Sequence, residues 1–473
     1  MKKQKTVKNR DGLFFSLPKA FVKGSNYTRI SFAVMGFGQM ARKQWIKGLL
    51  FLLTQVAFIT YLIAFGGNYL THLFSGKLGT KLSGEVWNEN LQIYEKIRGD
   101  NSFLILLYGV VTVVLLGLFT VVWAVNIKSS YTNDLKIGKG IKLNTFQEDV
   151  KELFNKNFYL PLLIPPFLGL TVFTLMPLIF MVLIAFTNYD FNHMPPGKLF
   201  SWVGLANFKN MFLISSDGGF ATAFIRVLVW TFVWAFFATF TNYIIGMLIA
   251  LLINKKGIKL KKLWRTLFVI AIAVPQFVTL LLMQKILDRS GILNVITGAD
   301  VLWLTDTRWN ALIPRLAIIV VNIWIGVPYT LLLCSGLLLN VPKDFYEAAR
   351  IDGASGTQIF LKITLPYMLH MTTPYLITQF VGNINNFNVI WLLTGGGPVD
   401  SVRYGNTQAQ ATDLLVTWLY RLTTDANPRY NVASVIGIVI FVISAVLSLI
   451  TFNKSSANKH EEAFQFLLDF NFF

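Results

Sequence analysis

Eight apolar stretches, each long enough to cross about 30 Å of hydrocarbon, constrain this chain more than any other feature. They cover residues 48–65, 103–125, 160–186, 227–253, 266–284, 316–339, 368–393 and 432–452. None alternates apolar and polar residues as a barrel strand does, so each must satisfy its backbone polar groups as a helix. The sequence therefore predicts an all-α polytopic membrane protein with eight transmembrane helices.

Charge predicts how these helices are oriented. Of the 42 Lys and Arg residues, 28 fall in the loops on the side that holds both termini and 14 in the loops on the other side. Because basic loops stay inside, we expect a multi-pass protein of the cell membrane with both termini cytoplasmic. Topology thus accounts for the net charge of +19, and we expect no nucleic-acid partner.

The cysteine and histidine residues give no sign of a disulfide, a metal site or a catalytic site. The single cysteine, Cys334, lies within an apolar stretch and cannot form an intrachain disulfide, so we expect a buried, small hydrophobic side chain. The four histidines are scattered without metal-ligand spacing. We expect no metal site and no catalytic residue on this chain.

The spacing of the apolar stretches predicts a two-helix extension on a six-helix core. The expected segments are a basic cytoplasmic N-terminal segment at 1–47, two transmembrane helices at 48–125, a cytoplasmic linker at 126–157, the core at 158–453 and a cytoplasmic tail at 454–473. Segment 1–47 mixes basic and aromatic residues, which suits contact with anionic membrane lipid but also suits a tail that only sets topology. The first apolar stretch begins too far from the N-terminus to be a signal peptide, so we expect it to remain uncleaved as a transmembrane helix.

Prolines interrupt several stretches and predict kinks or local unwinding. They occur at positions 161, 165, 166, 177, 275, 328 and 374.

A polar segment between the sixth and seventh stretches, "YEAARIDGASGTQIFLKITLPY" (346–367), reads as two short helices. Asp344 and Glu347 have the spacing of a capping box at the start of the first helix, and Gly353 can end it. Ser355 and Gln358 repeat the capping pattern for the second helix. Pro366 then ends that helix or leads into the next span.

One face of this hairpin carries small side chains at helical spacing. Ala348, Ala349 and Asp352 share it with Phe345. Small residues let another backbone approach closely. The face can pack on its own protein or be gripped by a partner, and the pattern alone leaves both open.

The hairpin resembles the EAA motif of ABC importer permeases, E-A-A-x3-G-x9-I-x-L-P, at every fixed position. The matching residues are Glu347, Ala348, Ala349, Gly353, Ile363, Leu365 and Pro366. The resemblance implies that residues 343–366, Asp352 included, form the coupling loop that docks on a cytoplasmic ATPase.

Two further stretches, "VNIWIGVPYTLLLCSGLL" (321–338) and "NINNFNVIWLLTGGGP" (383–398), resemble the larger membrane subunit of maltose/maltodextrin importers. The likeness covers most of residues 160–453, but the large exterior domain of the enterobacterial form is absent. A shorter, Gram-positive-type permease is therefore the better comparison. The resemblance implies import of oligosaccharides with a second permease, two copies of an ABC ATPase that uses ATP and Mg, and an extracellular solute-binding protein.

The absence of an ATP-binding motif and of acidic residues within the stretches agrees with an energy source on a separate protein. No G-x-x-x-x-G-K-[ST] loop occurs, so this chain should not hydrolyse ATP and should not be an enzyme. None of the eight stretches contains Asp or Glu, whereas ion-coupled carriers usually need an ionisable group in the membrane. The alternatives that remain are an ABC permease for another uncharged sugar and, less favoured, an ion-gradient carrier.

The polar residues inside the stretches suit an uncharged, hydroxyl-rich ligand. Two sets fall at i, i+3, i+4 and i+7, on one face of a helix each. They are Asn322, Ile325, Gly326 and Tyr329 in the sixth stretch and Gln379, Gly382, Asn383 and Asn386 in the seventh. Amides bond to hydroxyls and Tyr329 can stack on a sugar ring, although amides in spans also bond helix to helix. The family resemblance implies that these same eight positions line the sugar pocket.

Overall fold

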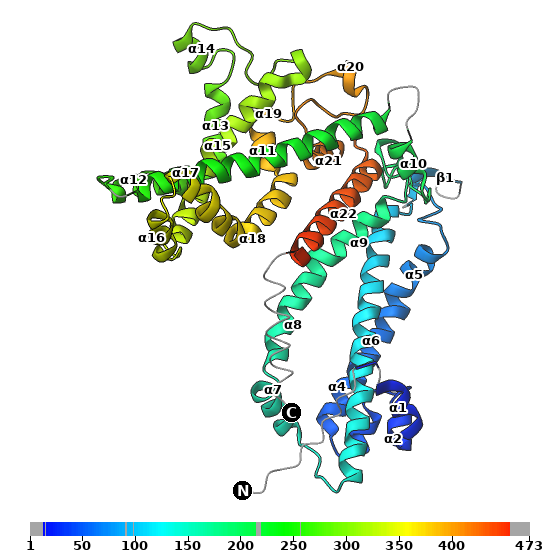
Figure 1. Cartoon of the computed structure of the whole chain (residues 1–473). Coiled ribbons are helices and arrows are strands. Elements are labelled where there is room, and N and C mark those ends of the chain that lie inside the picture. Colours follow the sequence, from blue (N-terminus) through cyan, green and yellow to red (C-terminus); the bar gives the residue numbers. More distant parts are fainter. Residues whose placement is uncertain are drawn as a thin grey trace. The chain divides into compact units, whose positions relative to one another are not determined.

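The computed structural model describes residues 13–454 apart from 15, 90–91, 98, 214–218 and 256. The chain divides between Val203 and Gly204 into two compact units, each built almost entirely of helices (Figure 1). The predicted tail at 454–473, Lys454 excepted, lies outside the described residues, as do the first twelve residues of the predicted segment 1–47.

The first unit contains nine α-helices, two π-helical turns, a 3-10 turn and a small hairpin among its described residues. Their bounds are α1 (Ser16–Lys23), α2 (Asn26–Ile30), α3 (Phe37–Met40), α4 (Trp45–Tyr61), η1 (Leu62–Gly66), α5 (Gly67–Phe74), β1 (Gly84–Asn88), β2 (Ile93–Ile97), α6 (Ser102–Gly138), α7 (Phe146–Asn155), α8 (Tyr159–Leu170), η2 (Thr171–Leu175), α9 (Met176–Ile184) and η3 (Phe191–His193). Strands β1 and β2 pair antiparallel, with Gly84 opposite Ile97. The apolar stretches gave no sign of this hairpin.

Three helical rods of the first unit are long and apolar enough to cross a membrane. They are Trp45–Phe74, Ser102–Gly138 and Tyr159–Ile184, and they contain or overlap the first three predicted stretches. Helix α1 packs on the C-terminal half of α6, where Ala20, Ile127 and Tyr131 form a small buried cluster. The indole Nε1 of Trp123 donates to the Phe32 carbonyl at 2.9 Å, which ties the segment after α2 to α6.

The second unit contains thirteen α-helices and one π-helical turn among its described residues. Their bounds are α10 (Ala206–Phe212), α11 (Phe220–Asn254), α12 (Lys261–Ala273), α13 (Gln276–Ile286), α14 (Ile292–Thr297), α15 (Arg308–Leu338), α16 (Lys343–Ile351), α17 (Gly356–Ile359), η4 (Phe360–Thr364), α18 (Leu365–Ile384), α19 (Phe387–Thr394), α20 (Ser401–Tyr404), α21 (Leu415–Thr424) and α22 (Tyr430–Lys454).

Three helices of the second unit are also long and apolar enough to cross a membrane. They are Phe220–Asn254, Arg308–Leu338 and Tyr430–Ile450, so the described residues hold six such spans in all. The pair α12 and α13 makes a seventh if it is one span, but it is bent by 89°. Pro275 stands at the bend, as the kink prediction requires. The predicted seventh stretch, 368–393, is divided between α18 and α19, and its polar residues keep α18 outside the set of spans. The count of eight spans therefore stays a prediction.

Helix α11 lies at the centre of the second unit and contacts both α15 and α18 (Figure 1). Its Trp230, Trp234 and Ala238 join a buried cluster with Ile318 of α15 and Val389 of α19. Further along α11, Tyr243 and Met247 pack with the buried Cys334, which confirms the prediction for that cysteine. The tight packing of α11 fixes how the faces of α15 and α18 are presented.

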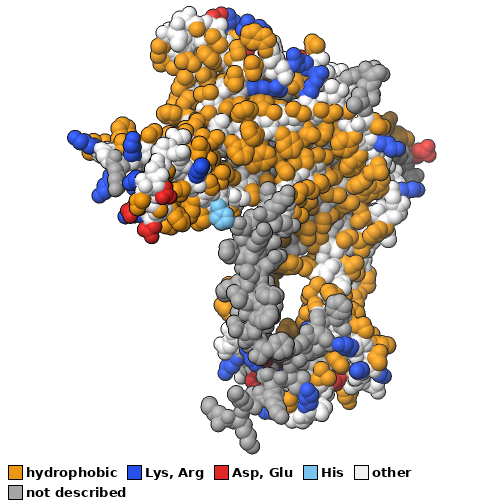
Figure 2. Space-filling model, viewed as in Figure 1, with side chains coloured by type: hydrophobic (Ala, Val, Ile, Leu, Met, Phe, Trp, Pro, Cys, Tyr) orange, Lys and Arg blue, Asp and Glu red, His pale blue; other side chains and the backbone are white. Residues whose placement is uncertain are grey.

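Hydrophobic side chains cover most of the visible face of the second unit (Figure 2). Lys and Arg side chains gather outside this apolar band, at the end near α12 and α16 and around α14 and α20. Such a band between charged ends is typical of a protein surface that faces lipid.

Candidate functional site

The face predicted on the sixth stretch lies on α15 and is turned partly against α11. Asn322 is buried, and its Nδ2 donates to the Ala238 carbonyl of α11 at 3.5 Å. Gly326 packs so closely on α11 that a Cβ there would lie 2.0 Å from Nδ2 of Asn242. Half of the predicted face therefore serves helix packing in this conformation.

The other half of that face is more open. Ile325 is half-buried against the central apolar cluster. Tyr329 is 52% exposed, so the described residues leave about half of its side chain uncovered. The arrangement can offer one aromatic surface beside a polar helix contact.

The face predicted on the seventh stretch divides in the same way. Gln379 and Gly382 of α18 are exposed, and no atom lies within 4 Å of a Cβ built on Gly382. Asn383 is buried: its Nδ2 donates to Thr239 Oγ1 at 2.9 Å, and its carbonyl accepts from Trp234 Nε1 at 3.1 Å. Its amide already bonds helix to helix, which is the alternative use of a membrane amide.

Asn386 has a local role at the break between α18 and α19. Its Oδ1 accepts from the Val389 N–H at 3.3 Å and caps α19, while its Nδ2 donates to Asn383 Oδ1 at 3.2 Å. The structure thus brings Asn383 and Asn386 together and leaves Gln379 and Gly382 exposed.

The polar hairpin has two short helices joined by a sharp turn, α16 and α17. Gly353 ends α16 with φ +74, a left-handed conformation that glycine adopts without a steric cost. Ser355 and Gln358 form the predicted capping box at the start of α17. Pro366 lies in the first turn of α18, so it leads into that helix rather than ending the hairpin.

The predicted cap at the start of α16 is wrong. The helix begins at Lys343 directly after Pro342, and no side chain caps it. Asp344 therefore lies inside the first turn, where its carboxylate can still favour the positive end of the helix dipole. A proline can set the start of a helix by backbone geometry alone, so a capping residue is not required there.

The residues of the motif divide between an exposed tip and a packed base. Glu347, Ala348, Asp352, Gly353 and Pro366 are exposed, while Ala349, Ile363 and Leu365 are half-buried. Leu365 packs beside the buried Cys334 and Met368. Apolar Phe345 and Ile351 lie exposed on α16, and Ile351 is 86% exposed. An exposed apolar tip on a packed base is a surface that a partner can cover.

A hydrogen bond joins the two arms of the hairpin. The hydroxyl groups of Tyr346, on α16, and Thr364, at the end of η4, lie 3.2 Å apart. A movement of α16 can therefore be transmitted through Thr364 to α18, which begins at the next residue.

Sequence reasoning missed a buried ionic network in the loop after α19. Asp413 is fully buried. Its carboxylate accepts from Gln410 N–H at 2.9 Å, from Thr417 Oγ1 at 2.8 Å and from Arg421 Nε at 3.3 Å. Burial raises the pKa of Asp413 above its ordinary value, against the opposing effect of Arg421 and the other donors.

Side chains of α11 and α15 donate hydrogen bonds to the same loop. Arg315 of α15 donates to the Ala411 carbonyl at 2.8 Å and lies over the Trp230 ring at 4.5 Å. Trp230 Nε1 donates to the Thr412 carbonyl at 3.1 Å. Asp413 and Arg421 are eight residues apart, a spacing with no local meaning, so only the folded loop pairs them.

Sequence reasoning also missed Asn242. This amide lies within one of the predicted apolar stretches, and that position was a sufficient signal to find it. Its Oδ1 is buried without a hydrogen-bond partner among the described residues. Across the described part of the chain, no three His, Cys, Asp or Glu side chains are grouped to hold a metal ion.

These features define the class first: a helical, multi-pass membrane protein with an exposed polar hairpin between two of its core helices. In fold it is similar to a bacterial ABC transporter that imports the acidic polysaccharide alginate, with a TM-score of 0.51 at 23% identity over 65% of this chain and 98% of that one. The two chains therefore share a fold.

Sequence comparison then gives the family. Residues 242–458 match the model described as "Binding-protein-dependent transport system inner membrane component". The chain is 35% identical to the maltodextrin permease MalC of Streptococcus pneumoniae, over 91% of this chain and 95% of that one. It is 33% identical to the galactooligosaccharide permease GanP of Bacillus subtilis, over 90% and 97%. The chain belongs to this family of ABC importer permease subunits.

Proposed function

We propose that this chain is the larger membrane subunit of an ATP-driven importer of maltodextrin-type oligosaccharides. The observation that carries the proposal is the 35% identity with the Streptococcus pneumoniae maltodextrin permease along 95% of that protein. The neutral amides and the open tyrosine of the candidate site suit such a ligand. The similarity to GanP makes galactooligosaccharides the second candidate.

In this proposal, Tyr329 and Gln379 make the first contacts with the sugar because they are the exposed polar and aromatic members of the two faces. Gly382 leaves room beside them, since no atom lies within 4 Å of a Cβ built there, whereas Ile325 and Gly326 would line the site only after α11 and α15 shift. Asn322, Asn383 and Asn386 bond to the protein in this conformation, so they bind sugar only when α11, α15 and α18 shift during transport.

The hairpin at 343–366 is the proposed coupling loop to two copies of a cytoplasmic ABC ATPase, which would bind ATP and Mg and hydrolyse the nucleotide. A second permease would complete the pathway, and an extracellular solute-binding protein would deliver the sugar. Both termini would be cytoplasmic, consistent with the basic loops. The six helices after residue 158 would form the core, with the two N-terminal helices as an extension.

Replacement of Tyr329 by alanine tests the sugar site. We expect the KM for maltotriose uptake to rise roughly three- to tenfold, because one stacking contact of about 1 kcal/mol is lost. Trp324, another exposed aromatic residue of α15, is the matched control and should tolerate alanine. Equal KM values for wild type and Tyr329→Ala, or an equal rise for Trp324→Ala, would remove Tyr329 from the site.

A further inference from the structure

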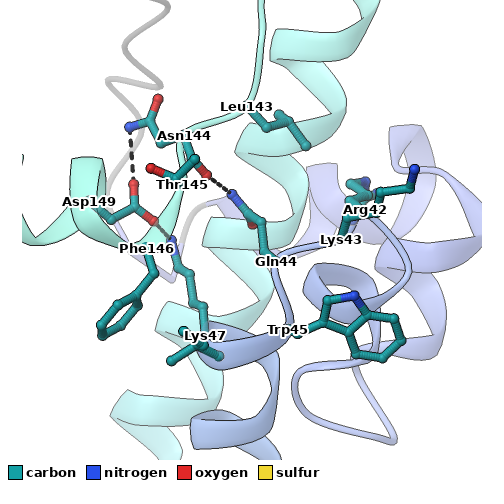
Figure 3. Close-up of a pocket in the computed structure, with 11 residues that line it drawn as sticks. Arg42, Lys43, Gln44, Trp45, Lys47, Leu143, Asn144, Thr145, Phe146 and Asp149 are labelled. Carbon is teal, nitrogen blue, oxygen red and sulfur yellow. Dashed lines mark hydrogen bonds and ion pairs between the residues drawn. The ribbon is translucent and has the colours of Figure 1, made fainter.

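A hollow of about 420 Å³ lies in the first unit, where α3 is followed by the start of α4 and where the segment before α7 passes close by (Figure 3). Its lining includes three basic side chains, Arg42, Lys43 and Lys47, and two aromatic ones, Trp45 and Phe146. Its volume lies within the usual range for small-ligand sites, about 300–1,000 Å³. None of these residues belongs to the proposed transport site.

Hydrogen bonds that side chains make to the backbone and to one another hold the walls of the hollow in place. Gln44 Nε2 donates to the Asn144 carbonyl at 2.7 Å, and Gln44 Oε1 accepts from Asn133 Nδ2 at 2.8 Å. Lys47 Nζ lies 2.6 Å from Asp149 Oδ2, and Asn144 Nδ2 donates to Asp149 Oδ1 at 3.0 Å (Figure 3). The shape of the hollow is therefore set before any ligand arrives.

Lys43 is an exposed lysine of the lining, and no ion pair joins it to another described residue. Arg42 is paired with Asp134 and Lys47 with Asp149, so these two charges are largely compensated. Lys43 has φ +62, where glycine or asparagine would cost less. A lysine that is unpaired among the described residues therefore lies at a turn where backbone geometry alone would favour another residue.

The hollow opens at the edge of an apolar surface. Trp45 is the first residue of the first membrane-crossing rod and is 66% exposed. Ile46 lines the hollow and is also exposed, as are Leu49, Leu50 and Leu53 further along α4. An amphipathic ligand can place a charged group in the hollow and a hydrocarbon chain along α4.

We propose that this hollow binds the headgroup of an anionic phospholipid. The phosphate is recognised by the Lys43 ammonium group, with Lys47 and Arg42 beside it. Trp45 lies at the level of the headgroups, where indole rings are preferred. One acyl chain covers the exposed residues of α4, which distinguishes the lipid from a free phosphate ion. The inference does not depend on which sugar is transported.

Native mass spectrometry of the full-length chain, purified in its complex from mixed phosphatidylglycerol and phosphatidylcholine membranes, tests the proposal. Wild type should retain phosphatidylglycerol in preference to phosphatidylcholine. Lys43→Asn should lower the retained phosphatidylglycerol at least threefold, since asparagine tolerates the left-handed turn but carries no charge. Lys43→Arg should keep it.

Lys23→Asn is the matched control, because Lys23 is an exposed lysine of the same N-terminal region that does not line the hollow. Equal retention of the two lipids by wild type would overturn the proposal, as would an equal loss in Lys23→Asn. Displacement of the retained lipid by inorganic phosphate alone would assign the hollow to a free anion and would also overturn it.

Discussion

Asp413 illustrates how much of the loop after α19 depends on one side chain. It is buried beside Arg421, whose guanidinium also donates to the Gly395 carbonyl. Gly396, with φ +87, lies so close that a Cβ there would meet Asp413 Oδ1 at 1.9 Å. Removal of the carboxylate would leave Arg421 without its charged partner in a site of low exposure.

We therefore predict that Asp413→Asn lowers the midpoint of thermal unfolding in detergent by several degrees. Loss of one partner of a buried ion pair costs about 3–5 kcal/mol, because the remaining charge is left uncompensated. Size-exclusion chromatography after heating measures this effect. Asp425→Asn, an exposed change of the same kind just after α21, should leave the midpoint unchanged. An Asp413→Asn protein as stable as wild type would show that the pair is not structurally important.

Residue-scale reasoning from sequence reached only part of the candidate site. The spacing of Asn322, Ile325, Gly326 and Tyr329 placed them correctly on one helix. It could not show that α11 covers Asn322 and Gly326, because the position of a neighbouring helix is a tertiary fact. The pairing of Asp413 with Arg421 was beyond sequence reasoning for the same reason.

At the scale of elements, the hairpin of α16 and α17 makes the clearest prediction. Gly353→Val should reduce the ATPase activity stimulated by binding protein while the complex still assembles. A β-branched residue resists φ +74 by roughly 1–2 kcal/mol, so the turn must rearrange and the tip must move. Glu347→Ala should act in the same direction. Measurement of ATP hydrolysis by the reconstituted complex, with and without binding protein, checks both.

Gly356→Ala provides the control for this experiment. Gly356 lies in the same hairpin, a Cβ there meets no atom within 4 Å, and its φ is not positive. This variant should keep the stimulated activity. If Gly353→Val also kept it in full, the coupling role of the hairpin would be contradicted.

Elements were predictable where one physical rule dominates. Long apolar stretches fixed six membrane-crossing rods, and Pro275 marked the bend between α12 and α13 because the residue before a proline avoids helical geometry. Stretch 368–393 was harder, since its apolar content continues across Asn386, where one helix ends and another is capped. Strands β1 and β2 are five residues each, too short for a clear alternating pattern.

At the scale of the whole molecule, the proposed importer separates the membrane pathway from the ATPase that drives it. The chain belongs to a family of ABC importer subunits, and its fold matches that of a polysaccharide importer. In the proposed mechanism, energy arrives from a separate ATPase through an exposed contact such as the hairpin. Flux through the pathway should depend strictly on that partner, whichever sugar is carried.

The most direct test is uptake of labelled maltotriose into proteoliposomes that contain the complete complex, with binding protein outside and ATP either enclosed or omitted. We predict uptake only when ATP is enclosed. Absence of uptake despite ATPase activity stimulated by binding protein would keep the permease assignment and exclude this sugar. Uptake without ATP would contradict the central claim that this chain works as the membrane subunit of an ATP-driven importer.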